Sequence, residues 1–503
     1  MAVKIEASWE VDIRSRTDTV VLAGIASVIV LLHLLTNSRY GFHRDELQFL
    51  SDARHLDWGF VAYPPFTPFV ERISMDLFGL SLVGLRLFSV LAQAVVVVVA
   101  GLMARELGGG RLAQATAALA VGLSPLALFE GTEFQYTSFG FFWWVLIAYC
   151  FVRLLKEENP RWWLAIGVLT GFGLLTKYSI VFYIAGVLGG ILLTRTRRYF
   201  LSPWFWTGTA IAFVICLPNL LWQVHHGFIS YHFLQSIHKR DVGEGRADGF
   251  LPRQLIMGFA PLWIPGLIGF LRSERYRLLG WMYVITLALF WAAKGRDYYM
   301  GEAYPVLVAM GAVLGEQWTA ALSERLRWAI RTVFFVLLAG FAAYVGAILV
   351  PLASGGPLKR FALSRNGDFR EEIGWTELVR TLADIRDSLS PEQRASLGIV
   401  VGNYGEAGAI EILGQAYGLP TPISMTNSAW LRGYLEPPPT TLILVGFSRE
   451  WVERNFTSCR LAGHNGNAEG VRNEESVYHP DIFVCGPPRE PWAEFWKEHL
   501  SFG

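Results

Sequence analysis

The stretch VGLRLFSVLAQAVVVVVAGLMA, residues 83–104, decides the fold, because it is an apolar run long enough to cross a lipid bilayer. Its one charged residue is Arg86, close to the start. A run of about 20 apolar residues becomes an α-helix in a membrane, since only the helix satisfies its backbone polar groups there. Residues 19–36 form a second run of this kind. We therefore expect a fold built around membrane-spanning helices.

The composition of the whole chain predicts a polytopic α-helical membrane protein. Of its 503 residues 53% are hydrophobic and 17% are charged, which is more apolar than an ordinary soluble chain. The formal net charge is +1 and no basic face is concentrated anywhere, so no nucleic acid partner is expected. Residues 19–36, the first apolar run along the chain, are long enough to stay in the membrane as an anchor, which argues against a cleaved signal peptide. About eleven spans are predicted, near residues 19–36, 83–104, 112–130, 138–153, 162–177, 180–194, 204–222, 254–271, 278–293, 302–320 and 328–351.

The arginines of the short loops predict the orientation of these spans. They gather in alternate connections and share one side with the N-terminal Arg14 and Arg16. The positive-inside rule makes that side the cytoplasm. The connections concerned hold Arg105 and Arg111, then Arg195, Arg197 and Arg198, then Arg272, Arg275 and Arg277, then Arg325, Arg327 and Arg331. The external side then receives the loops 38–82, 130–137, 223–253 and 294–301 and everything after about residue 352.

A change of composition near residue 352 predicts two domains. Residues 1–351 carry the apolar runs, whereas residues 352–503 are richer in charged residues, Gly and Pro. The second region alternates between helix-like and strand-like patterns, which predicts a soluble extracytoplasmic α/β domain. The expected elements are a helix at 370–389, strands at 397–404, 441–445 and 482–485, and a helix at 405–417.

Two further patterns lie in this C-terminal region. Cys459 and Cys485 could pair in an oxidising compartment or could remain free thiols. Gly402, Gly405 and Gly408 follow a predicted strand, but their spacing is GxxGxxG and not the GxGxxG of dinucleotide sites. We interpret these glycines as a tight turn from strand to helix.

The first external loop carries the most suggestive chemistry, an Asp45–Glu46 pair preceded by His43 and Arg44. One interpretation is a solvated amphipathic helix that lies on the membrane with its charges outward. The other is a partly desolvated acid whose pKa rises toward that of a general base, able to take a proton from an acceptor hydroxyl. The proline-rich stretch at 63–68 is predicted to form a rigid, non-helical bend in the same loop.

Two external cations complement this acid pair. Lys177 ends the fifth predicted span, where it could be a snorkelling anchor or a ligand for a lipid phosphate. Arg296 lies in a loop with Tyr298 and Tyr299 and could bind phosphate in the same way. The acids and cations together predict a polyprenyl-phosphate site. In the 223–253 loop, the four histidines fit no tight ligand spacing, which favours a mobile substrate lid over a metal site.

These residues resemble the first external loop of the bacterial glycosyltransferase family 39 and ArnT-like enzymes, relatives of protein O-mannosyltransferases. The resemblance extends over most of the chain. Its residues are Tyr40 to Glu46, His55 to Gly59, Pro64 and Pro65, Thr176 to Tyr178, Gly295, Arg296, Tyr298, Tyr299, Tyr304, Pro305, Tyr404 to Ile410 and Gly418 to Pro420.

The resemblance implies a GT-C fold whose external cavity takes a sugar from a polyprenyl-phosphate donor. The acceptor would be lipopolysaccharide, another glycan, a lipid or a protein. By this likeness Asp45 is the base and Glu46 a partner that orients either Asp45 or the acceptor. A second acid is expected in the next external loop, where both Glu130 and Glu133 are available. The cavity is expected to include His43, Arg44, His55, Tyr63 and Pro64. Some relatives hold a divalent metal near these acids; no cofactor is assigned here, and the ligands stay open.

The expected chemistry agrees with this assignment. A sugar on a lipid phosphate already has a good leaving group, so the enzyme needs a base and cations for the departing phosphate. A single displacement predicts inversion at the anomeric carbon. The rival hypothesis is a transporter of lipid-linked sugars or polysaccharides, but transporters hold ionisable groups midway through their spans, and here His33 and Arg86 are the main exceptions. The expected location is the bacterial cytoplasmic membrane.

Overall fold

The computed structural model describes residues 2–503, with side chains from residue 18 onward, so the side chains of Arg14 and Arg16 lie outside the described part. Contacts divide the chain into two compact units. We call them the membrane unit (the chain up to Asn37, Arg86–Leu221 and Arg240–Leu352) and the sheet unit (Ser38–Leu85, Trp222–Lys239 and Ala353–Gly503).

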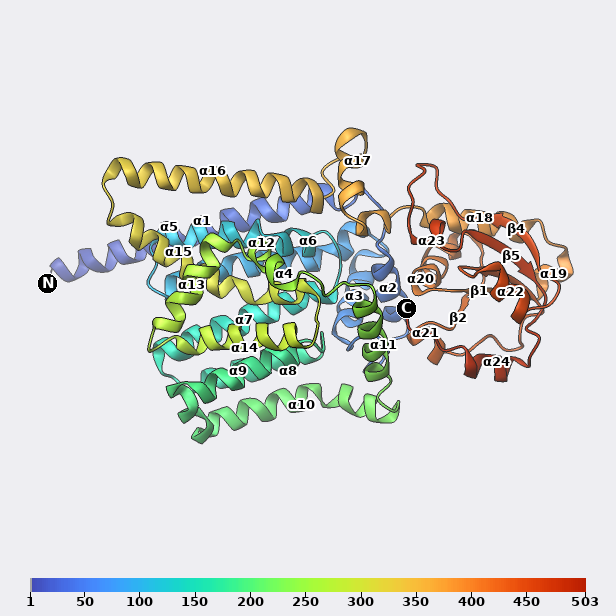
Figure 1. Cartoon of the computed structure of the whole chain (residues 1–503), viewed down its shortest axis with the longest axis horizontal. Helices are drawn as coiled ribbons and strands as arrows, with labels where there is room; N and C mark the ends of the chain where they lie inside the picture. The colour runs from blue at the N-terminus through green and yellow to red at the C-terminus, as the bar shows by residue number, and fades with distance from the viewer. Residues whose placement is uncertain (1) are drawn as a thin grey trace. The chain divides into compact units, whose positions relative to one another are not determined.

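The membrane unit is helical throughout its described elements (Figure 1). The helices α4 and α10 lie mostly within it. Its elements are α1 (Ala2–Thr36), α4 (Leu82–Glu106), α5 (Arg111–Gly122), α6 (Pro125–Glu130), α7 (Tyr136–Glu157), α8 (Trp162–Leu174), α9 (Ile180–Leu193), η1 (Arg195–Leu201), α10 (Pro203–His225), α12 (Phe250–Met257), α13 (Ala260–Arg272), α14 (Arg277–Ala292), η2 (Asp297–Ala303), α15 (Tyr304–Ala320) and α16 (Glu324–Leu349).

Five described helices are long and apolar enough to cross a membrane, and the number rises to seven if each of two bent pairs counts as one span. The five lie at Asp18–Thr36, Leu82–Glu106, Tyr136–Glu157, Pro203–His225 and Glu324–Leu349. Each coincides with a predicted span. The shorter helices α8 and α14 are also apolar. The chain is thus a helical membrane protein, and the count of eleven spans stays a prediction.

The predicted span at 254–271 is broken in the structure, which corrects that prediction. Helices α12 and α13 meet at an angle of 100°. Between them Phe259 adopts a left-handed φ of 54°, which ends the regular helix. Pro261 lies in the first turn of α13, where its missing N–H costs nothing because amides of the first turn have no intrahelical partner. Hydropathy could not reveal this break, because the residues on both sides are apolar.

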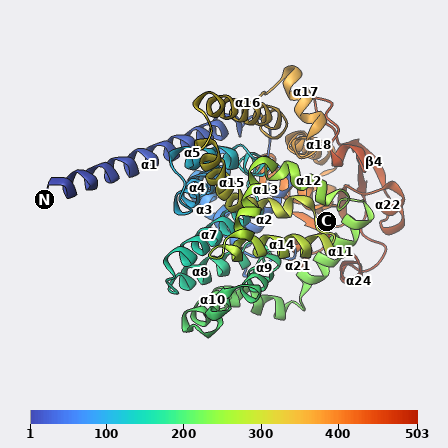
Figure 2. The ribbon, with the colours of Figure 1, turned by 60° about the vertical axis from the view of Figure 1, so that its left-hand side comes forward.

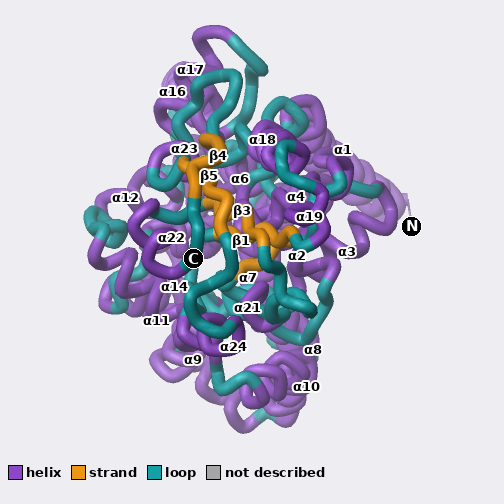
Figure 3. Tube along the Cα trace, turned by 90° about the vertical axis from the view of Figure 1, so that its right-hand side faces the viewer, coloured by secondary structure: helices purple, strands orange, loops and turns teal. Residues whose placement is uncertain are grey.

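The sheet unit combines helices with one mixed sheet (Figure 3). Helix α11 lies mostly within this unit. Its helices are α2 (Arg44–Arg54), α3 (Phe66–Phe78), α11 (Ile229–Gly243), α17 (Gly356–Arg365), η3 (Asp368–Arg370), α18 (Trp375–Asp387), α19 (Pro391–Ala395), α20 (Tyr404–Leu413), η4 (Gly414–Tyr417), α21 (Ser428–Leu431), α22 (Arg449–Asn455), α23 (Glu474–Val477) and α24 (Trp492–Glu498). Its strands are β1 (Leu397–Val401), β2 (Pro422–Ser424), β3 (Thr441–Val445), β4 (Arg460–His464) and β5 (Asp481–Cys485).

The sheet has the strand order β2-β1-β3-β5-β4. Strand β1 pairs in parallel with β2 and β3, whereas β5 runs antiparallel to both β3 and β4. On one face Leu442 and Leu444 pack with Val452 of α22 and Phe495 of α24. Alternation along the strands turns the neighbouring residues to the opposite face, and α18 and α20 contact strands of the same sheet. A disulfide joins Cys459 to Cys485, the pairing that the sequence left open.

Two predicted loops are partly helical. The first external loop folds into α2 and α3, and α3 begins at Phe66 with Pro68 in its first turn. The stretch at 63–68 was predicted to be non-helical, and its second half is helix because proline is tolerated in a first turn. The segment 223–253, predicted to be a loop, is helical from Ile229 to Gly243 and again from Phe250.

Candidate functional site

The first helix of the sheet unit begins with a reciprocal cap that uses two predicted site residues. The His43 Nδ1 atom accepts a hydrogen bond of 3.2 Å from the Asp45 backbone N–H. In return, the Glu46 carboxylate accepts one of 2.8 Å from the His43 backbone N–H. Such a capping box satisfies amide groups that have no partner within the helix. Glu46 is fully buried, so its carboxylate serves the helix end, while Asp45 beside it stays partly exposed.

Helix α20 packs along α2 in the same direction, which brings the two N-termini together. A Cβ atom at Gly408 would lie 2.4 Å from the Leu47 carbonyl oxygen, and one at Gly405 would lie 3.0 Å from Cβ of Arg44. Glycine is therefore required at Gly408 for this close approach. The two glycines thus form a seam between helices, and only Gly402 belongs to the predicted turn after β1. The N-termini of two helices favour negative charge at their common end.

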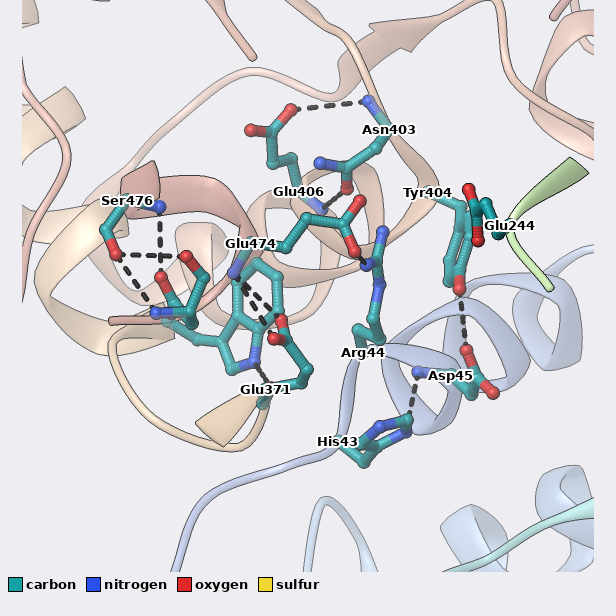
Figure 4. A network of polar contacts seen from close by, with 12 residues as sticks. His43, Arg44, Asp45, Glu244, Glu371, Asn403, Tyr404, Glu406, Glu474 and Ser476 are labelled. Atoms are coloured by element: carbon teal, nitrogen blue, oxygen red, sulfur yellow. Dashed lines mark hydrogen bonds and ion pairs between the residues drawn. The ribbon is translucent and has the colours of Figure 1, made fainter. Parts of the chain in front are cut away.

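Asp45 lies at this common end and is fixed by a residue of α20. The Tyr404 hydroxyl donates a hydrogen bond of 2.8 Å to Asp45 Oδ1 (Figure 4). The Arg44 guanidinium lies 4.7 Å from the centre of the Tyr404 ring and pairs with Glu474. A charge-assisted hydrogen bond of this kind orients a carboxylate more firmly than water does. The hydrogen bond thus holds the Asp45 carboxylate in one orientation, and the side chain is partly exposed.

Buried acids surround Arg44 at the same end of the sheet unit (Figure 4). Burial and, to a smaller extent, the nearby Glu475 raise the pKa of Glu406 to about 8. Burial and Glu475 likewise raise the pKa of Glu371 to about 8. Glu406 also caps α20, because its carboxylate accepts a hydrogen bond of 3.1 Å from the Gly402 N–H. A raised pKa keeps the carboxyls of Glu406 and Glu371 mostly neutral near pH 7. The Arg44 guanidinium offsets the negative charge of Glu474, with which it pairs.

The C-terminal half of α2 is tied to the same region by buried polar contacts. Asp52 pairs with Arg432 and accepts a hydrogen bond from Tyr63. Burial raises the pKa of Asp52, and Arg432 opposes that shift. His55 Nε2 lies 3.1 Å from Glu411 Oε1, whose second oxygen accepts from the Ser51 hydroxyl. Tyr63 and His55 therefore have partners within the sheet unit.

The membrane unit holds the second group of predicted residues, centred on Lys177. This residue lies in the turn between α8 and α9 and is only 8% exposed. Its Nζ atom is 3.3 Å from Glu302 Oε1 and 3.4 Å from the Thr137 hydroxyl. Three aromatic rings surround the same nitrogen, at 5.5 Å for Tyr136, 5.4 Å for Tyr298 and 4.8 Å for Tyr299. The ammonium group is thus held inside an aromatic cage and does not reach toward a membrane surface as an anchor would.

Arg296 is held in place by a carboxylate. Its Nε and Nη2 atoms each donate a hydrogen bond of 2.7 Å to the two oxygens of Asp241. This fork geometry is the one by which arginine binds carboxylate or phosphate in two parallel contacts. The predicted acids of the second loop are both buried: Glu130 accepts a hydrogen bond of 2.9 Å from Ser138, and Glu133 lies 3.3 Å from the Gln135 amide nitrogen.

A divalent metal does not fit the described residues. No three His, Cys, Asp or Glu side chains are placed to hold one ion in the part of the chain that the structure describes. The acid pair of the first external loop already accepts hydrogen bonds, Asp45 from Tyr404 and Glu46 from the His43 backbone. Among the histidines of the 223–253 segment, His226 stacks on Trp222 with ring centres 4.0 Å apart. We derive no step through a metal.

The structure brings the predicted residues together in two groups, one in each unit. His43, Arg44, Asp45 and Glu46 meet at the start of α2, whereas Lys177, Tyr298 and Tyr299 share one cage. His43, Arg44, Tyr63 and Pro64 are buried, and their part in a substrate cavity stays a prediction. Sequence reasoning missed the partners that hold these residues: Tyr404, Glu411 and Arg432 in the sheet unit, and Tyr136, Asp241 and Glu302 in the membrane unit.

Comparison with known proteins gives one family match and several relatives. The family described as dolichyl-phosphate-mannose-protein mannosyltransferase matches residues 62–222. The lipid A galacturonosyltransferase RgtD of Rhizobium johnstonii is 26% identical over 356 residues, which cover 68% of this chain and 72% of that protein. The lipopolysaccharide core galacturonosyltransferase RgtB of the same organism is 29% identical over 180 residues, which cover 35% of this chain and 36% of that protein.

Solved structures share the fold. The apo structure of ArnT from Cupriavidus metallidurans matches with a TM-score of 0.58 at 15% identity and covers 93% of this chain and 98% of that one. The ArnT structure bound to undecaprenyl phosphate matches with a TM-score of 0.55 at 16% identity, over 92% and 97% of the two chains. The chain shares the fold of these ArnT structures and is similar in sequence to glycosyltransferases.

The two groups of residues offer the two kinds of chemistry that sugar transfer requires. The sheet unit presents an oriented, partly exposed carboxylate at Asp45. The membrane unit presents a caged ammonium at Lys177 and a forked guanidinium at Arg296. A carboxylate can accept a proton, and the two cations can hold a phosphate. Comparisons give the transporter hypothesis no support.

Proposed function

We propose that this glycosyltransferase moves a sugar from a polyprenyl-phosphate donor to the lipid A or core region of lipopolysaccharide. The single observation that carries the proposal is the hydrogen bond from Tyr404 to Asp45, which holds one carboxylate in a defined orientation at a helix N-terminus. A base needs such an orientation to meet an acceptor hydroxyl. Glu46 supports Asp45 indirectly, because it closes the cap from which Asp45 projects.

In the proposed reaction the acceptor hydroxyl oxygen attacks the anomeric carbon of the donor sugar. Asp45 takes the hydroxyl proton, and the bond between the anomeric carbon and the phosphate oxygen breaks. Polyprenyl phosphate leaves with the bonding electrons, and Lys177 and Arg296 stabilise its charge. The displacement inverts the anomeric centre, because no carboxylate forms a covalent intermediate. Donor phosphate would compete with Glu302 for Lys177 and with Asp241 for Arg296.

The relatives support the choice of substrates. RgtD is a lipid A galacturonosyltransferase and RgtB acts as a lipopolysaccharide core galacturonosyltransferase. We therefore propose a uronic acid, first of all galacturonic acid, as the transferred sugar. The ArnT structure with undecaprenyl phosphate supports a polyprenyl phosphate as the carrier.

The finer architecture belongs to the same proposal. We propose about eleven spans, a transmembrane domain at residues 1–351 and an extracytoplasmic α/β domain at residues 352–503. The protein would lie in the bacterial cytoplasmic membrane with its N-terminus in the cytoplasm. The disulfide between Cys459 and Cys485 supports an external location for the second domain, since disulfides persist in oxidising compartments. Labelling of introduced cysteines from the outside of intact cells tests this topology.

A deletion strain complemented with wild type, Asp45→Asn or empty vector tests the function. Mass spectrometry would measure both the polyprenyl-phosphate sugars and the lipid A and core oligosaccharide. We expect the deletion to lose one uronic acid from lipid A or core and to accumulate the donor, and only wild type to reverse both changes. An unchanged lipopolysaccharide and an unchanged donor pool would refute the proposal. Normal complementation by Asp45→Asn would refute the role of Asp45 alone.

A further inference from the structure

A cavity in the membrane unit has no part in the proposed reaction. It has a volume of about 480 Å³ and lies between α5, α13, α15 and α16. Small-molecule sites occupy roughly 300–1,000 Å³, so the cavity is large enough for a ligand. On α15 it extends from Gly311 to Thr319, a rise of about 12 Å along the helix axis. Figure 2 shows α13, α15 and α16 of this unit from a second side.

The walls of the cavity suit a hydrocarbon chain. They are formed mainly by apolar side chains, among them Leu262, Leu314, Phe334 and Phe335. The space exists because α15 carries glycine there: a Cβ atom at Gly315 would meet nothing within 4 Å. Helices α13 and α15 approach each other closely one turn earlier on α15, since a Cβ at Gly311 would lie only 2.0 Å from the Leu262 carbonyl oxygen. The helices thus touch at Gly311 and leave room beside Gly315.

The polar residues of the cavity leave one positive charge without a negative partner. The Glu316 carboxylate caps α5, because it accepts hydrogen bonds of 2.6 Å from Gly110 N–H and 3.3 Å from Ala113 N–H. Arg331 donates through Nε and Nη2 to the Thr319 hydroxyl, at 3.1 and 2.9 Å. Within the described side chains no carboxylate pairs with Arg331, which stays partly exposed. Its charge is therefore open to an external anion.

Two exposed tryptophans lie near Arg331 and indicate its depth in the membrane. Trp318 lines the cavity and is 58% exposed, and Trp328 on α16 is 65% exposed. Tryptophan is enriched on membrane helices at the headgroup level of the bilayer. Arg331 lies less than one helical turn beyond Trp328 along α16. We infer that the cavity binds one acyl chain of an anionic membrane phospholipid, whose headgroup phosphate pairs with Arg331.

Native mass spectrometry of the purified full-length protein tests this site. The delipidated protein would be titrated with phosphatidylglycerol and, separately, with phosphatidylethanolamine of the same acyl chains. We expect one phosphatidylglycerol to bind with clear preference. Gly315→Phe should abolish this binding by filling the cavity, and Arg331→Gln should weaken it about tenfold by removing the charge.

The chain offers a matched control for each variant. Gly340 on α16 also has open space around its Cβ position but does not line the cavity, so Gly340→Phe should retain binding. Arg325 is exposed on the same helix, and Arg325→Gln should retain binding too. If Gly315→Phe does not fold, Arg331→Gln and its control still decide the question.

Two outcomes would overturn the inference. Equal binding of both phospholipids, or equal losses in the variants and their controls, would mean that only annular lipid was measured. Displacement of the phospholipid by undecaprenyl phosphate would assign the cavity to a polyprenyl chain instead. Sugar transfer, measured separately, should be unchanged in Arg331→Gln, so the lipid site can fail while the proposed function stands.

Discussion

Tyr404 donates a hydrogen bond of 2.8 Å to Asp45 although 359 residues separate them in the sequence. The C-terminal region thereby supplies the group that orients the proposed base. This contact accounts for the presence of a tyrosine at the first position of α20, whose hydroxyl reaches across to the end of α2. The proposed base and the residue that orients it come from two helices joined along a glycine seam.

Replacement of Tyr404 by Phe should lower kcat while the protein stays folded. The variant keeps the ring beneath Arg44 and loses only the hydroxyl that orients Asp45. A hydrogen bond to a charged group contributes about 1.5–3 kcal/mol, so we expect a loss of roughly 10- to 100-fold. The pH profile of kcat should shift as well, which a purely structural role would not cause. Tyr478→Phe, at a position 71% exposed, is the control. Unaltered kcat and pH profile in Tyr404→Phe would remove Tyr404 from the mechanism.

Replacement of Lys177 by Met should raise KM for the polyprenyl-phosphate donor more than it lowers kcat for a saturating donor. The ammonium lies inside the cage formed by Tyr136, Tyr298 and Tyr299. Lys177→Arg should restore the donor KM only poorly, because a planar guanidinium does not fit the space of the ammonium group. The matched control is Lys294→Met, at an exposed position in the loop between α14 and η2. A donor KM that stays at the wild-type value in Lys177→Met would argue against phosphate binding by Lys177.

Removal of Asp52 should destabilise the sheet unit. Asp52→Ala leaves the Arg432 charge and the Tyr63 hydroxyl without their buried partner. The loss of one member of a buried ion pair costs about 3 kcal/mol or more. Thermal unfolding in detergent, followed by circular dichroism, should therefore begin at a lower temperature. Asp76→Ala, which removes an exposed pair with Arg72 on α3, should leave the curve in place, and equal curves for both variants would contradict the prediction.

The stability of the sheet unit should fall as the pH rises from about 5 to 8. Burial raises the pKa of Glu406 to about 8 from an ordinary 4.5, so the folded protein keeps a proton that the unfolded chain has lost. Stability that depends on such a proton is complete below the unfolded pKa and is lost as the pH passes through the folded pKa. Glu406→Gln should flatten this dependence in unfolding measurements at several pH values. A slope in Glu406→Gln as steep as in wild type would assign the effect to other groups, such as Glu371.

Hydropathy predicted much of the membrane unit but not its breaks. Helices lie at the predicted spans 83–104, 138–153 and 204–222, because a long apolar run has few alternatives in a bilayer. The bend between α12 and α13 depends on the left-handed φ of Phe259, which an apolar residue type does not announce. Hydropathy averaged over a window of residues cannot detect the backbone geometry of a single residue.

The sheet was predicted in part for a similar reason. The buried strands β1, β3 and β5 fall at predicted positions because each is a short apolar run. Strand β2 has three residues and begins with Pro422, and β4 is an exposed edge strand with the polar sequence RLAGH. Both lie at the edges of the sheet, where pairing needs little apolar burial.

The candidate site was predicted as residues but not as contacts. Asp45, Lys177 and Arg296 could be named from the sequence because charged residues beside apolar runs are few. Their partners Tyr404, Glu302 and Asp241 could not, since a single sequence holds no record of which distant residues meet. The acid of a buried pair looks like any surface acid until the fold is known.

The glycine seam between α2 and α20 also bears on how this enzyme can vary. Since Gly408 lies against the Leu47 backbone, the spacing of the two helices is set by main-chain atoms. The acid and its tyrosine are thereby kept in register by the main chain. Even an alanine at Gly408 would push the two helices apart and separate Asp45 from Tyr404.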